Sequence, residues 1–295
     1  MKIFKGFSIF LLTLVLLESC FEPPEFPAAP QLTFDRVEFI DGPSTDSLVI
    51  YLTFRDGDGD LGIDANDLDY ISYPFHSQYY YQDNGAGGLD SLATFAASSE
   101  SGAEYHIIDI PKPKQGKLIF ERTRKLPGFG YLPEMNCRDY EALSPFSNVL
   151  IDSADIHALD EIAINNIIDT LRGGGTLFYQ LRDTLYRSTN LNHYNLEVRF
   201  YTFDDAEPDP NKRWKEFDWG DPPYCQPFHM RFPFLTDTPG QGLEGTLRYA
   251  MPSLGWNPLF SIKRLNIKVR IKDRNLNVSN WVESGEFTLA EKTVN

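Results

Sequence analysis

Short runs of alternating apolar and polar residues, bounded by Gly, Pro and Asp, recur along this chain of 295 residues. Alternation with a period of two places the apolar side chains on one face of a strand, so each run predicts a half-buried β-strand. Such runs occupy residues 32–40, 47–54, 195–201, 243–249 and 264–271, and a last strand is expected over residues 281–289. The chain is therefore predicted to be mainly β.

Residues 153–171 are the exception to this pattern. Ser153 is a typical N-cap residue, and apolar residues from Ile156 to Leu171 follow at nearly helical spacing. The glycines at 173–175 predict the end of the element. We expect one helix here, inside an otherwise β-rich region.

Acidic residues follow three of the predicted strands. Strand 47–54 is followed by an Asp-rich loop, strand 195–201 by Asp204 and strand 264–271 by Asp273. Two interpretations are open. Either these are separate turns with the usual preference for Asp and Gly, or the strands share one sandwich and their polar ends gather at one pole.

The loop after the second strand is the most acidic segment. Counting from its first aspartate, carboxylates fall at positions 1, 3, 5, 9 and 12, the spacing of oxygen ligands in a calcium loop. These residues are Asp56, Asp58, Asp60, Asp64 and Asp67. A strand precedes the loop and Leu61 stands where an EF-hand has Gly, so we exclude an EF-hand. We expect the five carboxylates to bind Ca²⁺. The alternative is a solvated acidic turn, in which the carboxylates repel one another.

The N-terminal residues 1–20 have the layout of a secretory signal. Two lysines precede an apolar run over residues 7–17, and Ser19 comes directly before Cys20. A membrane-spanning helix needs about 20 apolar residues, so this run is too short for an anchor. The segment resembles a bacterial lipobox.

That resemblance implies that residues 1–19 are removed and that Cys20 is acylated, with palmitate-like chains holding the protein on the outer membrane. Residues 20–30 are rich in proline and would form an extended tether. Glu22 and Glu25 favour display at the cell surface, and a periplasmic location is the alternative.

Four segments together resemble a group of largely uncharacterised lipoproteins of Bacteroidota. The segments are residues 52–62, which contain the sequence DGDGDLG, and residues 231–235, 243–246 and 271–280. The resemblance implies an immunoglobulin-like antiparallel β-sandwich from residues 31–67 and 191–291, with residues 68–190 as a large β-rich insertion. It further implies that Asp273, Asn275 and Asn277 lie at the same pole as the Asp loop and supply additional oxygen ligands. It implies no activity.

Besides Cys20, the chain has only two cysteines, Cys137 and Cys225. Disulfides persist in the cell envelope, and two cysteines allow a single pairing. A Cys137–Cys225 disulfide is one expectation, and two small buried thiols are the other.

Charge and motifs exclude several classes of function. A net charge of −15 disfavours nucleic acid and anionic lipid headgroups as partners. The five histidines are scattered without the spacing of a zinc site, and the chain has no G-x-S-x-G, H-E-x-x-H or Gly-rich phosphate motif. We therefore expect a noncatalytic protein.

Aromatic residues crowd the segment from Tyr70 to Tyr81. Aromatic side chains beside polar loops are typical of protein interfaces and of sugar stacking, so Tyr79, Tyr80 and Tyr81 are candidates for a partner or ligand surface. The alternative is that alternate tyrosines face the core.

These features together predict an accessory or structural subunit of an outer-membrane protein complex, with a calcium-stabilised loop. Two other classes remain as alternatives. One is a glycan-binding surface lipoprotein that serves nutrient uptake, and the other is a secreted hydrolase without a recognisable signature.

Overall fold

The computed structural model describes residues 26–64, 67–98, 103–111, 116–236 and 240–294. The signal segment and Cys20, the expected lipidation site, lie outside the described residues. No helix among the described residues is long and apolar enough to cross a membrane.

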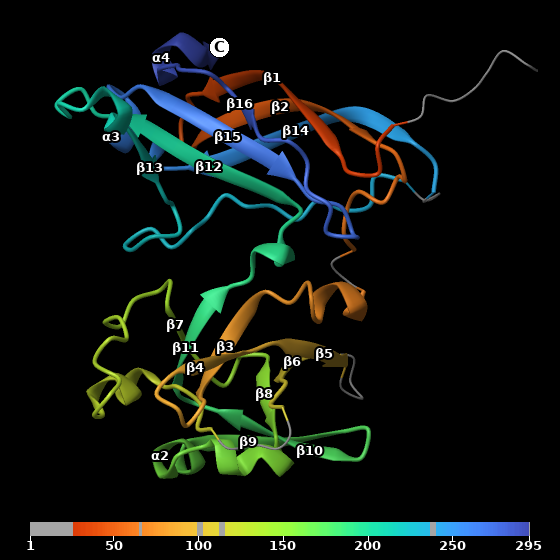
Figure 1. The fold of residues 1–295 in the computed structure, drawn as a ribbon, viewed down its shortest axis with the longest axis vertical. Coiled ribbons are helices and arrows are strands. Elements are labelled where there is room, and N and C mark those ends of the chain that lie inside the picture. Colours follow the sequence, from red (N-terminus) through yellow and green to blue (C-terminus); the bar gives the residue numbers. More distant parts are fainter. Residues whose placement is uncertain (1–25, 65–66, 99–102, 112–115, 237–239, 295) are drawn as a thin grey trace, which may run out of the picture.

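The chain forms two β-rich bodies that lie one above the other along the long axis (Figure 1). The upper body is a sandwich of two four-stranded sheets, with strand orders β14-β2-β1-β17 and β13-β12-β15-β16. The strands of the first sheet are β14 (Leu243–Ser253), β2 (Asp46–Asp56), β1 (Gln31–Ile40) and β17 (Thr293–Val294). Those of the second are β13 (Trp214–Phe217), β12 (Leu196–Phe203), β15 (Leu265–Ile271) and β16 (Val282–Glu283).

Alternating side chains build the core of this sandwich. In β15 every second residue from Leu265 to Ile271 is buried, as the period of two predicts. Helix α3 (Trp256–Phe260) closes one side of the core, where the fully buried Trp256 donates a hydrogen bond from Nε1 to the carbonyl oxygen of Met251 at 2.8 Å. The prediction of a mainly β chain with a β-sandwich is confirmed.

The lower body holds two further sheets, with strand orders β5-β6-β8-β10-β9 and β4-β3-β11-β7. The first comprises β5 (Thr94–Ser98), β6 (Glu104–Ile108), β8 (Val149–Asp152), β10 (Thr176–Leu181) and β9 (Ile167–Gly173). The second comprises β4 (Leu89–Leu92), β3 (Gln78–Asp83), β11 (Thr184–Thr189) and β7 (Tyr140–Ala142). The hydrophobic core of the lower body lies entirely within residues 68–190, the segment that was expected to be an insertion.

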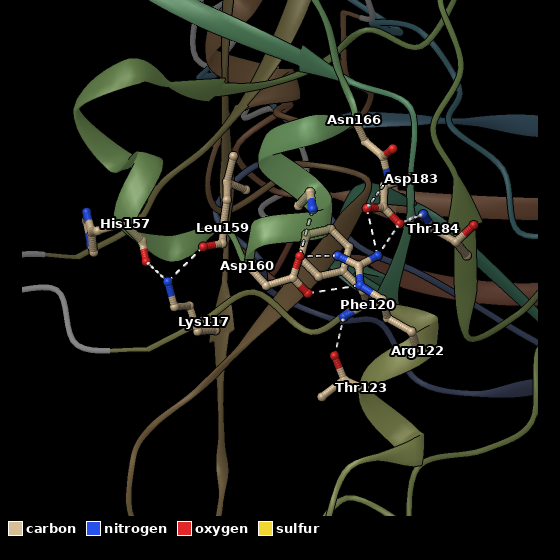
Figure 2. Close-up of polar contacts among 11 residues, drawn as sticks. Lys117, Phe120, Arg122, Thr123, His157, Leu159, Asp160, Asn166, Asp183 and Thr184 are labelled. Atoms are coloured by element: carbon tan, nitrogen blue, oxygen red, sulfur yellow. Dashed lines mark hydrogen bonds and ion pairs between the residues drawn. The ribbon is translucent and has the colours of Figure 1, made fainter.

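A partly buried ion network ties the short helices of the insertion together (Figure 2). Arg122, in the 3-10 helix η3 (Glu121–Lys125), donates to Asp160 at 2.5 Å and to Asp183 at 2.7 Å. Asp183 also accepts from Asn166 Nδ2 and from the amide of Thr184. Because Arg122 binds two carboxylates from different segments, it fixes the loop before β11 against helix α2 (Glu161–Asn165).

The prediction of one helix over residues 153–171 is wrong for the second half of this segment. The segment contains the 3-10 helix η4 (Ser153–Ala158) and the short helix α2, and then continues as strand β9. Asp160 starts α2 anew by accepting a hydrogen bond from the amide of Ala163, and the β-branched Ile167 and Ile168 favour a strand that pairs with β10.

The last predicted strand, residues 281–289, is also shorter than expected. Strand β16 covers two residues, and Gly285, with a positive φ of 70°, turns the chain out of the sheet. Thr288 then begins helix α4 with a capping box. The remaining helices are η2 (Leu68–Ile71), η5 (Leu191–His193), η6 (Pro210–Lys212) and α4 (Leu289–Lys292).

The two chain segments that connect the sandwich to the insertion contact each other. Asn190 Nδ2 donates to the carbonyl oxygens of Pro74 at 2.8 Å and of His76 at 2.7 Å. Arg231, from the sandwich, donates to the carbonyl oxygen of Tyr70 at 2.7 Å and lies 2.9 Å from Nδ1 of His193. A polar junction therefore joins the two bodies.

A disulfide between Cys137 in the insertion and Cys225 in the sandwich adds a covalent link, with 5.9 Å between the Cα atoms. This separation lies in the usual range for disulfides. Two chain connections and one disulfide thus hold the insertion covalently, in addition to the polar junction.

The junction histidines predict a loss of stability in acid. Burial lowers the pKa of His76 and of His193 to about 4. The unfolded chain, with a histidine pKa near 6.5, binds protons that the folded chain excludes, so the free energy of unfolding falls as the pH drops from about 6.5 to about 4. We expect a smaller fall in the double variant His76→Asn, His193→Asn than in wild type, measured by urea unfolding at about pH 7 and about pH 5. Equal falls in the two proteins would contradict this assignment.

Candidate cation site

Four aspartates meet at one pole of the sandwich. Asp56 ends β2, Asp58 and Asp60 lie in the loop that follows, and Asp273 follows β15. One carboxylate oxygen from each of the four lies within 4.8 Å of the others. Because β2 and β15 belong to different sheets, this group connects both sheets of the sandwich.

Two glycines allow the acidic loop to fold tightly against its neighbours. A Cβ atom at Gly57 would lie 2.2 Å from the carbonyl oxygen of Phe26, and one at Gly59 would lie 2.3 Å from that of Gln241. Gly59 also has a positive φ of 64°. Residues with side chains would clash at both positions, so Gly is required to bring the aspartates together.

Hydrogen bonds orient the carboxylates. The amide of Asp60 donates to Asp56 Oδ2 at 3.0 Å, and Asn275 Nδ2 donates to Asp60 Oδ2 at 2.8 Å. Asn277 donates to Asp273 from both its amide and its side chain. The Oδ1 atoms of Asp56, Asp58 and Asp60 are buried and have no hydrogen-bond partner. Three buried carboxylate oxygens of this group therefore have no donor to satisfy them.

The electrostatics of the group favour a bound cation. Asp56 and Asp273 are 0% and 1% exposed, and Asp60 is 7% exposed. Burial, followed by the charge of Asp58, raises the pKa of Asp56 to about 6. Burial, followed by the charge of Asp273, raises the pKa of Asp60 to about 7. Buried carboxylates without partners are costly unless protons or a cation neutralise them, and this group can hold a metal ion.

The structure brings together only some of the five aspartates that the loop spacing predicts as calcium ligands. Asp56, Asp58 and Asp60 belong to the group of four, whereas Asp64 and Asp67 do not. After Leu61 the chain runs beside the segment around Phe232, to which the amide of Ile63 donates, and this carries the later residues away. Asp67 is exposed and caps η2 by accepting from the amide of Asp69 at 3.0 Å.

The fourth carboxylate comes from the other sheet. The loop spacing does not include Asp273, whose place at this pole follows from the alternative in which the polar strand ends gather together and from the family resemblance. The ligand set is therefore assembled by the sandwich and not by one continuous loop.

The three candidate tyrosines differ in exposure, because Tyr79 and Tyr81 are half-buried whereas Tyr80 is buried. Tyr80 is fully buried in the hydrophobic core of the insertion, so it is not available to a partner or ligand on the surface. Tyr79 packs edge-on against His76, with 4.5 Å between ring centroids, and the Tyr81 hydroxyl lies 2.7 Å from Ser188 Oγ. For Tyr80, packing in the core is the correct interpretation.

Comparisons with protein-family models, with curated proteins and with solved structures found no match for this chain.

Proposed function

We propose that this protein is a noncatalytic, calcium-stabilised lipoprotein of the outer membrane, anchored through Cys20, that serves as an accessory or structural subunit of a membrane-associated protein complex. The observation that carries this proposal is the buried group of four aspartates with three unpartnered oxygens. Its position between the two sheets points to a structural role.

The ligand chemistry favours Ca²⁺ over other cations. All four candidate ligands are carboxylates, and hard cations bind oxygen ligands, whereas Zn²⁺ prefers sulfur and nitrogen. Ca²⁺ accepts irregular sets of 6–8 oxygens, whereas Mg²⁺ requires near-octahedral geometry and keeps several waters. Carboxylates supplied by a loop and by a second sheet suit the more flexible coordination of Ca²⁺.

The location of the site supports a scaffold and not an enzyme. Asp56 and Asp273 are almost completely buried, so a substrate has no access to the metal through them. The loop that carries Asp58 and Asp60 leads directly into the insertion (Figure 1). A cation here would fix the first connection between the two bodies and hold the insertion in a defined orientation, as a docking subunit requires.

Purification of the full chain from membranes in mild detergent tests this function. We expect a stable partner to co-purify with wild type in calcium, and recovery to fall with chelator or with Asp60→Asn. Asp67→Asn is the matched control, because it removes one acidic charge from the same segment but lies outside the group of four. Isolation of the chain alone from calcium-containing detergent, or equal recovery with both variants, would contradict the proposal.

A further inference from the structure

A cavity of about 360 Å³ lies between the two sheets of the insertion. Its lining includes Tyr80 of β3, Thr94 of β5, His106 of β6, Glu141 of β7 and Phe146 in the turn before β8. Pockets for small ligands commonly measure about 300–1,000 Å³ and combine apolar walls with a few fixed polar groups. The cavity is large enough for one small molecule.

A carboxylate is held in place inside this cavity. Glu141 Oε2 accepts hydrogen bonds from the Tyr80 hydroxyl at 2.5 Å and from Gln78 Nε2. Gln78 is fixed in turn, because its Oε1 accepts from Arg187 Nη1 at 2.9 Å. A chain of three hydrogen-bonded groups behind Glu141 therefore orients the carboxylate before any ligand binds.

Two buried polar atoms at the cavity lack partners. Thr94 is 2% exposed, and its Oγ1 has no hydrogen-bond partner; the same is true of His106 Nδ1. His106 pairs with Ala96 in the β5–β6 ladder, which places Thr94 and His106 on the same face of the sheet. Burial lowers the pKa of His106, and its Nε2 lies 3.3 Å from Glu104, so a neutral ring with its proton on Nε2 leaves Nδ1 as an acceptor. Buried polar atoms without partners require an explanation, and a ligand provides one.

An aromatic ring stands at the rim. Phe146 is 92% exposed, although its backbone sits in a turn held by hydrogen bonds between Ser144 and Ser147 and from its own amide to Ser144 Oγ. A large apolar ring that is exposed beside a polar cavity offers a stacking surface.

We propose that this cavity binds one sugar residue of a neutral carbohydrate, with Phe146 stacking on its apolar face and Glu141, Thr94 and His106 bonding its hydroxyl groups. A hydroxyl both donates and accepts, so it satisfies the acceptors Glu141 and His106 as well as the hydroxyl of Thr94. A carboxylate at this position repels anionic ligands. This inference goes beyond the proposed function and does not depend on calcium binding.

The test uses the folded protein in calcium-containing buffer. An array of neutral oligosaccharides and polysaccharide fragments, with methyl glycosides of glucose, galactose, mannose and N-acetylglucosamine as single-residue ligands, identifies carbohydrates for calorimetry. Binding of the methyl glycosides indicates a free sugar as ligand, whereas binding of the longer chains alone indicates a polysaccharide end. Both results support the proposal if the variants below weaken binding.

Two variants separate binding from folding. We expect Phe146→Ala, at an exposed position, to weaken binding about tenfold without changing the melting temperature. Thr94→Val should also weaken binding but leave the melting temperature equal or higher, because it removes a buried hydroxyl without a partner at nearly constant shape. Tyr131→Ala, an exposed aromatic of the insertion outside the cavity, is the control and should bind like wild type.

Three results would overturn the assignment. They are the absence of binding to every neutral carbohydrate, binding that neither Phe146→Ala nor Thr94→Val weakens, and binding of the diamine cadaverine in place of sugars. The last result would identify a pocket for an ammonium group.

Discussion

Calcium is expected to raise the melting temperature of the protein by on the order of 5–10 °C relative to the same sample in chelator. A ligand that binds only the folded state, at about 100 times its dissociation constant, adds about 2.7 kcal/mol to the free energy of unfolding. The gain arises because the cation neutralises the buried Asp56, Asp60 and Asp273. Differential scanning calorimetry in calcium and in chelator measures it.

The variant Asp60→Asn should raise the melting temperature in chelator and lower it in calcium, relative to wild type. Without calcium it removes a carboxylate whose pKa burial and Asp273 raise to about 7, so the melting temperature should exceed that of wild type. With calcium it removes a ligand, so most of the gain should disappear. Asp67→Asn should retain the wild-type difference. If wild type has the same melting temperature in calcium and in chelator, the four aspartates do not bind calcium and form only an acidic turn.

Loss of the Cys137–Cys225 disulfide is expected to cost about 4.6 kcal/mol of unfolding free energy in the chain-entropy model. The two cysteines are 88 residues apart in sequence, so the bridge strongly restricts the unfolded chain. Urea unfolding of the double variant Cys137→Ala, Cys225→Ala, compared with oxidised wild type, measures the loss.

Thiol labelling checks that the bridge is present before any comparison of stability. The unfolded, unreduced protein should show no reactive thiol from Cys137 or Cys225, and two labelled thiols would contradict the bridge. A control with Cys20→Ser removes the remaining cysteine, so that labelling reports on this pair alone.

Sequence predicts the elements whose signal is local. The strands β1, β2, β12, β14 and β15 follow from alternation, because one face of each is buried in the sandwich core. The pattern over residues 153–171 predicts one helix, but apolar residues at nearly helical spacing also fill a strand. Pairing of β9 with β10, a tertiary contact, decides that segment.

The ligands of the candidate cation site also differ in how far apart they lie in the sequence. Asp56, Asp58 and Asp60 are close in sequence, and a tight Gly-rich turn is enough to bring them together. Asp273 arrives from another sheet, and no spacing rule contains it. The cavity of the insertion lies beyond sequence reasoning for the same reason: Thr94, His106 and Glu141 come from three strands and form no motif.

The contact between the two ends of the insertion bears on the order of folding. Strand β2 precedes the insertion and β12 follows it, so in a fully unfolded chain the sandwich can form only by closing a very long loop. The entropy lost in closing a loop grows with its length. Once the insertion is folded, Asn190 holds its exit against Pro74 and His76 at its entrance, and the effective loop becomes short. The route in which the insertion folds before the sandwich therefore has the smaller entropic barrier.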